Sequence, residues 1–164
     1  MSVVVPFAFL KRLHSPITWD DVQFGFKNGI IDHRTVIDYA CLSVSTDGTE
    51  DEDIITLACA TPTDSITELL SRIAKSETEV AVSSKNWALI QAAYVSEANT
   101  RDPLTAVEEI YESFDYPREL SLFIRYMPMN GPDLGSVEAN EQRMVDALKD
   151  FSSLIVSPVS EAAG

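Results

Sequence analysis

The sequence predicts an all-α fold: a single compact domain of about seven to eight short helices packed as successive helical hairpins. Apolar residues recur at the three- and four-residue spacing of helix faces along most of the 164 residues. N-cap residues, prolines and glycines divide these stretches into helices with short connections. Residues 3–5 and 79–82 are strand candidates, but two short strands do not make a sheet. We expect the domain to cover residues 1–155 and the tail, residues 156–164, to fray.

The first half of the chain predicts four helices. Thr18 precedes Asp20 and Asp21, which is typical of an N-cap with acidic residues in the first turn. This helix should extend over residues 18–28, and Asp32 can cap the second helix. Each of the next three helices should bury one apolar face. The face of the second helix comprises Val36, Ile37, Ala40, Cys41 and Val44. That of the third comprises Ile54, Ile55, Ala58 and Cys59, and that of the fourth comprises Ile66, Leu69, Leu70, Ile73 and Ala74.

Prolines mark the boundaries of the fourth and later helices. The Thr-Pro pair at 61–62 and the Asp-Pro pair at 102–103 each place proline in a first helical turn, where its missing N–H costs little. Pro117 interrupts the helix that should end near residue 115, because proline cannot donate to the preceding turn. A further short helix should reach Pro128, and Ser136 should begin the last helix after a loop rich in glycine and proline.

A helix from Ser83 or Ser84 to Ala98 has apolar residues on most of its circumference, so it should lie at the centre of the domain. The helices after it should each bury one face. These faces comprise Leu104, Val107, Ile110, Tyr111 and Phe114 in the first, Leu120, Phe123, Ile124 and Met127 in the second, and Met144, Leu148 and Phe151 in the last.

Two stretches of the chain resemble a known family. The runs TWDDVQFGFKNGIIDHRTVIDYA (18–40) and FDYPRELSLFIRYMP (114–128) are similar to an uncharacterised bacterial family, domain of unknown function 2247. The resemblance covers roughly residues 5–150 and is most specific in the second run. It implies a small, helical, bacterial, cytosolic protein, and it carries no established active site.

The charge balance is strongly acidic. The chain has 26 Asp plus Glu against 12 Lys plus Arg, a net charge of −14. Each half, divided at residue 82, has 13 acidic and 6 basic residues, so acidity belongs to the whole folded surface. This charge disfavours nucleic acids and anionic membranes as partners, because both are polyanions. It favours a basic protein partner, although acidity that serves solubility alone is the alternative.

The sequence also predicts the compartment and the state of the cysteines. Lys11 and Arg12 follow the first apolar run instead of preceding it, which is the wrong order for a secretory signal. The longest apolar run, residues 3–10, is too short to span a membrane. We therefore expect a cytoplasmic protein with reduced thiols. Cys41 and Cys59 fall on apolar helix faces, which predicts buried structural cysteines.

No metal, cofactor or catalytic motif emerges from the sequence. His14 and His33 lack the Glu-x-x-His spacing of a helical di-metal site. The acidic segment 47–53 lacks the glycine and the final glutamate of a calcium loop, and the two cysteines lie too far apart for a zinc motif. Phosphate-binding and nucleophile-elbow patterns are absent. We expect no cofactor, no metal and no enzymatic activity.

The candidate partner-binding residues form two sets. The acidic set would steer a basic partner, and it comprises Glu50, Asp51, Glu52, Asp53, Glu108, Glu109 and Glu112. The second set, Tyr116, Arg118, Arg125 and Tyr126, could form a recognition surface beside the bend at Pro117, since tyrosine and arginine often anchor interfaces. The alternative for the second set is a packed helix corner in which Arg125 pairs with a local acid.

Three functional hypotheses remain open. The first is a non-enzymatic binding module whose acidic surface engages a basic partner, for example an immunity-type inhibitor of a bacterial toxin such as a nuclease. The second is a helical scaffold or oligomerisation module, which would leave an apolar patch on its surface. The third is a small enzyme with a site assembled from scattered residues, namely Asp20, Asp21, His33, Arg125 and Tyr126. The sequence does not determine the oligomeric state.

Overall fold

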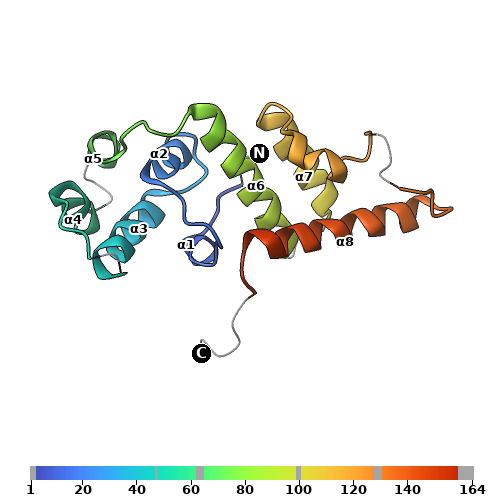
Figure 1. The fold of residues 1–164 in the computed structure, drawn as a ribbon, viewed down its shortest axis with the longest axis horizontal. Coiled ribbons are helices and arrows are strands. Elements are labelled where there is room, and N and C mark those ends of the chain that lie inside the picture. Colours follow the sequence, from blue (N-terminus) through green and yellow to red (C-terminus); the bar gives the residue numbers. More distant parts are fainter. Residues whose placement is uncertain (1–2, 47, 62–64, 99–100, 128–130, 159–164) are drawn as a thin grey trace. The chain divides into compact units, whose positions relative to one another are not determined.

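The computed structural model describes residues 3–46, 48–61, 65–98, 101–127 and 131–158 (Figure 1). Within these ranges the chain forms eight α-helices, one 3₁₀-helix and no strand, so the predicted all-α class is confirmed. The elements are α1 (Phe7–Leu10), α2 (Trp19–Lys27), α3 (His33–Thr46), α4 (Glu52–Ala58), α5 (Ile66–Ile73), α6 (Val80–Glu97), α7 (Pro103–Ser113), η1 (Arg118–Phe123) and α8 (Val137–Ile155).

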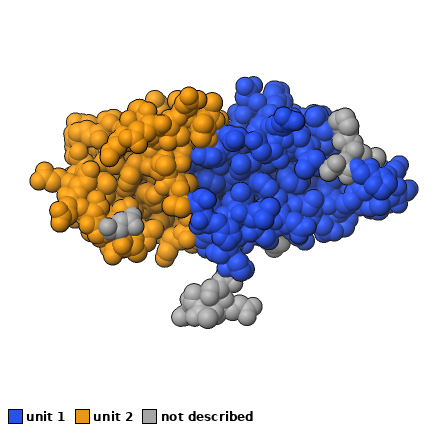
Figure 2. All heavy atoms as spheres, viewed as in Figure 1, with its two compact units in different colours: residues 1, 12–15, 85–164 blue, residues 2–11, 16–84 orange. Residues whose placement is uncertain are grey.

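Contacts divide the chain into two compact units (Figure 2). Unit 1 comprises residues 1, 12–15 and 85–164, and unit 2 comprises residues 2–11 and 16–84. The boundary falls inside α6, which begins in unit 2 and ends in unit 1. The prediction of one domain over residues 1–155 stays a prediction.

Local capping determines where the first helices of unit 2 begin. The Thr18 hydroxyl accepts the Asp21 N–H at 3.2 Å while the Asp21 carboxylate accepts the Thr18 N–H at 3.1 Å, which is a complete capping box. At the start of α3, Asp32 accepts the Thr35 N–H at 2.9 Å. Both helices begin as predicted, because these bonds satisfy N–H groups that have no partner inside the helix.

The fourth helix confirms its predicted face but not its start. Five predicted residues are buried, namely Ile66, Leu69, Leu70, Ile73 and Ala74. The helix begins at Ile66 rather than at the Thr-Pro pair, and Pro62, on which the earlier start depends, lies outside the described residues. The strand candidate 79–82 is also wrong, since Val80 begins α6, and residues 3–5 form no strand.

The predicted burial of both cysteines is wrong. Cys41 and Cys59 are exposed free thiols. In α4 the buried residues are Ile54 and Leu57, a spacing of three, whereas Ile55 is exposed. The short helix therefore buries a narrower face than the predicted one, which leaves Cys59 at its C-cap in solvent.

Unit 1 contains most of α6, and this part of the helix is buried on several sides as predicted. Trp87, Ala88, Ala92 and Ala93 are fully buried. The last helix, α8, begins at the predicted cap, where Ser136 accepts the Ala139 N–H at 3.1 Å. Its buried positions include Leu148 and Ser152, and the Phe123 and Phe151 rings lie 5.5 Å apart.

The tail departs from the prediction at its first residues. Val156 is buried and forms an isolated antiparallel bridge with Leu13. The Ser157 N–H donates to the Arg12 carbonyl at 2.9 Å, and the Arg12 side chain donates back to the Ser157 carbonyl at 2.9 Å. Residues 156–157 are therefore held by residues near the start of the chain instead of fraying, and residues 159–164 lie outside the described residues.

Candidate functional site

The end of α7 has an unusual backbone. The Tyr116 N–H donates to the Tyr111 carbonyl at 2.8 Å, the long bond of a Schellman motif. The motif requires a left-handed residue after the C-cap, normally glycine, but here Asp115 has φ of 59° and Tyr116 has φ of 58°. Side chains with a Cβ pay a steric cost in this region. Two successive left-handed residues therefore make this turn costly for the fold.

The charges at this helix end are also unfavourable. A helix C-terminus carries partial negative charge and is stabilised by cations. The last turn of α7, which the structure describes in full, contains no basic residue. Instead, three exposed acids surround it: Glu109 in the turn before, Glu112 in the last turn and Asp115 just beyond the C-cap. The helix end and these carboxylates together create a negative site that a cation would stabilise.

Exposed aromatic rings lie beside these acids. Tyr116 is 57% exposed and Tyr126 is 59% exposed. The Tyr116 ring meets the buried Tyr111 ring edge-to-face, with centroids 5.2 Å apart. Partial desolvation raises the pKa of Tyr126, and the nearby Glu112 carboxylate raises it further, so this ring lies within the field of Glu112. We name Glu109, Glu112, Asp115, Tyr116 and Tyr126 the α7 corner.

The α7 corner combines exposed tyrosines with two features that cost stability, namely left-handed backbone and acids at the negative helix end. Such departures from local rules tend to gather at functional sites, where binding compensates for them. An ammonium or guanidinium group placed here would meet the carboxylates and could also contact a tyrosine face. The arrangement is therefore suited to binding a cation.

Arg125, next to the corner, has a structural role. Its Nε lies 2.7 Å from a Glu108 carboxylate oxygen, and its Nη1 lies 3.5 Å from Asp102 and 3.4 Å from Glu141. The Glu108 hydrogen bond is the largest cause that raises the pKa of Arg125. The ion pair between Arg125 and a nearby acid, one part of the predicted alternative, is present, whereas Tyr116 and Tyr126, which that alternative would pack into the corner, are exposed. Arg118 is exposed, and it follows Pro117 at the start of η1.

Arg125 also lines an apolar groove of about 440 Å³ within unit 1. Leu122, Met127 and Val137 line it and are exposed. Sequence analysis missed this groove because Leu122 and Val137 lie off the predicted buried faces, and because Met127, predicted to be buried, is exposed. A usable signal was present, since a large apolar residue outside the buried face of a short helix is available for an interface.

The acidic set falls into two places. Glu50 to Asp53 belong to unit 2, whereas Glu108, Glu109 and Glu112 belong to unit 1. Asp51 caps α4 by accepting the Asp53 N–H at 2.9 Å, and Asp53 lies 3.2 Å from Arg72 Nε. Two members of the predicted segment thus have local structural roles, while Glu50 and Glu52 are exposed. Asp47 lies outside the described residues.

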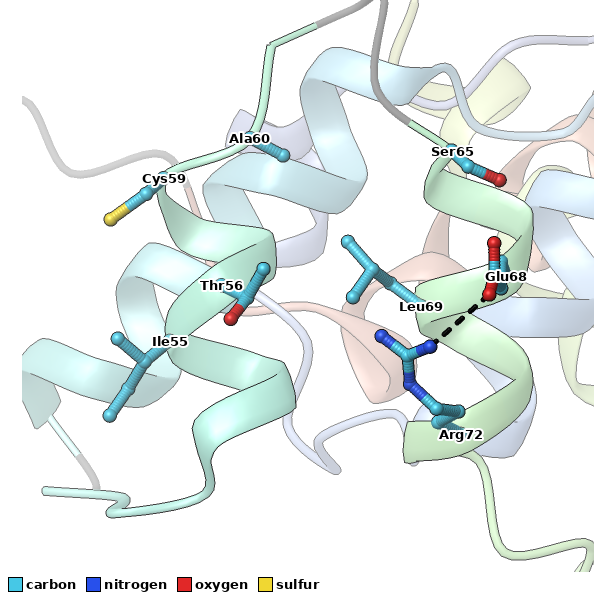
Figure 3. Close-up of a pocket in the computed structure, with 8 residues that line it drawn as sticks. All are labelled: Ile55, Thr56, Cys59, Ala60, Ser65, Glu68, Leu69 and Arg72. Atoms are coloured by element: carbon cyan, nitrogen blue, oxygen red, sulfur yellow. Dashed lines mark hydrogen bonds and ion pairs between the residues drawn. The ribbon is translucent and has the colours of Figure 1, made fainter.

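A second hollow, of about 540 Å³, lies between α4 and α5 in unit 2 (Figure 3). Thr56 and Leu69 extend toward each other from the two helices, and Arg72 pairs with Glu68 at 3.3 Å. The Cys59 side chain points away from Leu69 and Arg72 (Figure 3). The thiol is therefore not positioned to react with a group bound between these two side chains.

The carboxylates of the enzyme hypothesis hold backbone in place. Asp20 accepts the N–H groups of Ser76, Glu77 and Thr78 at 2.8, 2.8 and 2.9 Å. Partial burial acts to raise the pKa of Asp20, but these donors outweigh it and lower the pKa below its ordinary value. Asp21 accepts the Ser83 hydroxyl at 2.7 Å.

The other members of that hypothesis are divided between the units. His33 is exposed in unit 2, while Arg125 and Tyr126 belong to unit 1. Among the described residues, no group of three or more His, Cys, Asp and Glu side chains could hold a metal ion. In the same part of the chain, no helix is both long and apolar enough to cross a membrane. Whether the chain is an enzyme stays open to experiment.

Comparison with known families identifies the chain. Residues 7–153 match the model of DUF2247, described as an uncharacterized protein conserved in bacteria. The chain belongs to this family. No curated protein and no solved structure matches the chain. Membership in DUF2247 confirms the resemblance of the two sequence runs, and the second run includes Tyr116 and Tyr126 of the α7 corner.

Proposed function

We propose that this DUF2247 protein is a non-enzymatic protein-binding module that engages a basic protein through the α7 corner. The observation that carries the proposal is the set of carboxylates at the negative end of α7, beside exposed Tyr116 and Tyr126. Arginine and lysine side chains fit this chemistry because they pair with carboxylates and contact aromatic faces.

The overall charge would assist association. A net charge of −14 attracts a basic protein over distances comparable to the Debye length, about 8–10 Å at physiological salt. Long-range attraction of this kind raises the association rate more than it prolongs the complex. We therefore expect association to slow strongly as ionic strength rises, while dissociation changes little.

The apolar groove would supply the complementary part of the interface. Interfaces commonly combine an apolar anchor with a rim of charged and aromatic groups. Leu122, Met127 and Val137 provide apolar surface, and Arg125, which lines the groove, directly precedes Tyr126 of the α7 corner in the chain. A toxin neutralised by an immunity-type inhibitor is one specific form of such a partner, and the identity of the captured protein decides whether it applies.

The test is affinity capture from a lysate of the native bacterium, eluted with a salt gradient, followed by kinetics on the purified partner. Two charge-reversed variants with equal net charge are compared: Glu109→Lys with Glu112→Lys at the corner, and Asp146→Lys with Asp150→Lys at exposed positions of α8. Corner reversal should slow association by about tenfold or more beyond the α8 variant.

The two variants distinguish specific recognition from general charge. Equal losses in both would mean that net charge alone drives binding, which contradicts a role for the α7 corner. A partner that binds the corner variant as fast as the unmodified protein would also contradict it. If the folded protein used as bait retains no basic protein, the proposed function itself is contradicted.

A further inference from the structure

Two exposed thiols lie close together in unit 2. Cys41 belongs to α3 and Cys59 is the C-cap of α4, two helices that pack against each other. Both thiols are free and exposed. The Cys41 thiol donates to the Ala58 carbonyl oxygen with a sulfur–oxygen distance of 3.4 Å. Ala58 is the residue directly before Cys59, so the hydrogen bond ends one peptide unit from the second cysteine.

The hydrogen bond sets a limit on the separation of the two residues. In a trans peptide the carbonyl oxygen lies about 3 Å from the next Cα, so the Cys41 sulfur lies within about 6 Å of the Cys59 Cα. A disulfide needs the two sulfurs within bonding distance and Cα atoms about 4.4–6.8 Å apart, so the bond forms only once Cys59 adjusts toward the Cys41 sulfur. Because Cys59 stands where the chain leaves α4, a shift of its backbone costs the terminal hydrogen bonds of its own N–H to the Ile55 and Thr56 carbonyls and leaves the earlier turns intact.

We propose that Cys41 and Cys59 form a reversible disulfide that fastens α4 to α3. The oxidant is a low-molecular-weight disulfide such as oxidised glutathione. One cysteine thiolate attacks a sulfur of this oxidant, forming a mixed disulfide and releasing one small thiolate. The second cysteine then attacks the mixed disulfide, forming the internal bond and releasing the second small thiolate. The two protons lost by the protein thiols pass to the two released thiolates.

The arrangement is typical of a regulatory bond more than of a structural one. Reduced thiols are the norm in the cytoplasm, and disulfides that form there are usually transient. Both sulfurs are accessible to a soluble oxidant and reductant, unlike those of a bond sealed in a core. The bond would close the stretch between the two cysteines, which contains Glu50 and Glu52, and would thereby restrict the unfolded chain.

The test equilibrates the full chain with reduced and oxidised glutathione at several ratios, stops the exchange with acid, and then traps free thiols with excess N-ethylmaleimide near neutral pH. Mass spectrometry should find a monomer lighter by two hydrogen atoms, with no alkylated cysteine and a linked peptide pair containing Cys41 and Cys59. Dithiothreitol should restore two alkylatable thiols. In urea, the oxidised form should unfold at a higher midpoint than the reduced form.

The single variants Cys41→Ser and Cys59→Ser serve as matched controls, and each should stop at a mixed disulfide with glutathione. Accumulation of two mixed disulfides on the unmodified chain would overturn the proposal, because the second step would then not occur. Disulfide-linked dimers without the internal bond would overturn it as well. The unmodified chain carries the decisive measurement, so a folding defect in a variant does not obscure the result.

Discussion

The start of α2 and the end of α7 use acidic residues in opposite ways. At the start of α2, Asp20 and Asp21 lie at the positive end of a helix, and hydrogen bonds occupy both carboxylates. At the end of α7, Glu112 and Asp115 lie at the negative end and are exposed. The first arrangement stabilises the fold, whereas the second costs stability. This contrast separates acids that serve structure from acids available to a partner.

The largest expected effect on stability is at the start of α2. Asp20→Ala should lower the free energy of unfolding by about 2–3 kcal/mol, because three backbone N–H groups lose a charged acceptor. Urea denaturation at neutral pH measures the loss. Asp38→Ala, which removes an exposed i,i+4 ion pair with Arg34, is the control and should cost less than about 0.5 kcal/mol.

The pH dependence of this difference gives a second readout. The folded-state pKa of Asp20 lies below its ordinary value of 3.8. Its contribution is therefore present in full above that ordinary value and is lost as pH falls through the lower folded pKa. The difference in free energy of unfolding between the unmodified chain and Asp20→Ala should therefore become smaller in the same acidic range. A difference that persists unchanged there would mean that lost packing, and not the charged acceptor, causes the destabilisation.

The start of α2 and the end of α7 also differ in how far the sequence could predict them. The capping box of Thr18 and Asp21 depends on residues three apart, so a local pattern was enough. The bonds from Asp20 to residues 76–78 join positions more than fifty residues apart, and no local pattern reports them. The left-handed conformation of Asp115 was also unpredictable, since the turn normally calls for glycine.

The misplaced cysteines have a comparable physical reason. Helical spacing indicates which residues share a face, but the width of the buried face depends on what packs against it. In α3, Val36, Ile37 and Ala40 are buried while Cys41, on the edge of the same stripe, is exposed. Sequence therefore predicted α2 to α8 and most core residues. It missed α1, and the short helix expected to reach Pro128 is instead the 3₁₀-helix η1, which ends at Phe123. It did not predict the edges of each face, which is where the thiols and the groove residues lie.

The next largest effect concerns the acids beside the α7 corner. Arg125→Met should lower the free energy of unfolding by about 1–2 kcal/mol, since Asp102, Glu108 and Glu141 would lose their shared cation. The value is below that of a fully buried pair because the arginine side chain is 32% exposed. Chemical denaturation measures it, and added salt should reduce the loss by screening repulsion among the three carboxylates.

Arg34→Met is the matched control for this substitution. The Arg34 side chain is 76% exposed and contacts one carboxylate, Asp38, at 3.5 Å. Its loss should change stability by less than about 0.5 kcal/mol. Similar losses for the two variants would show that Arg125 is an ordinary surface residue. The negative charge of the corner would then extend over Asp102, Glu108 and Glu141, and the boundary drawn here between structural and available acids would be wrong.

The smallest expected effect on stability is the most informative, because this substitution should stabilise the chain where the two earlier ones destabilise it. Asp115→Gly should raise the free energy of unfolding by about 0.5–1 kcal/mol, since glycine adopts the left-handed conformation without strain. Asp115→Asn tolerates the same conformation but removes the charge, so it separates backbone strain from helix-end repulsion. Thermal unfolding measures both variants.

If the corner binds a basic partner, both variants should associate with it more slowly while being at least as stable as the unmodified chain. A destabilised Asp115→Gly would show that Asp115 holds the turn in place, and the end of α7 would then resemble the start of α2 instead of opposing it.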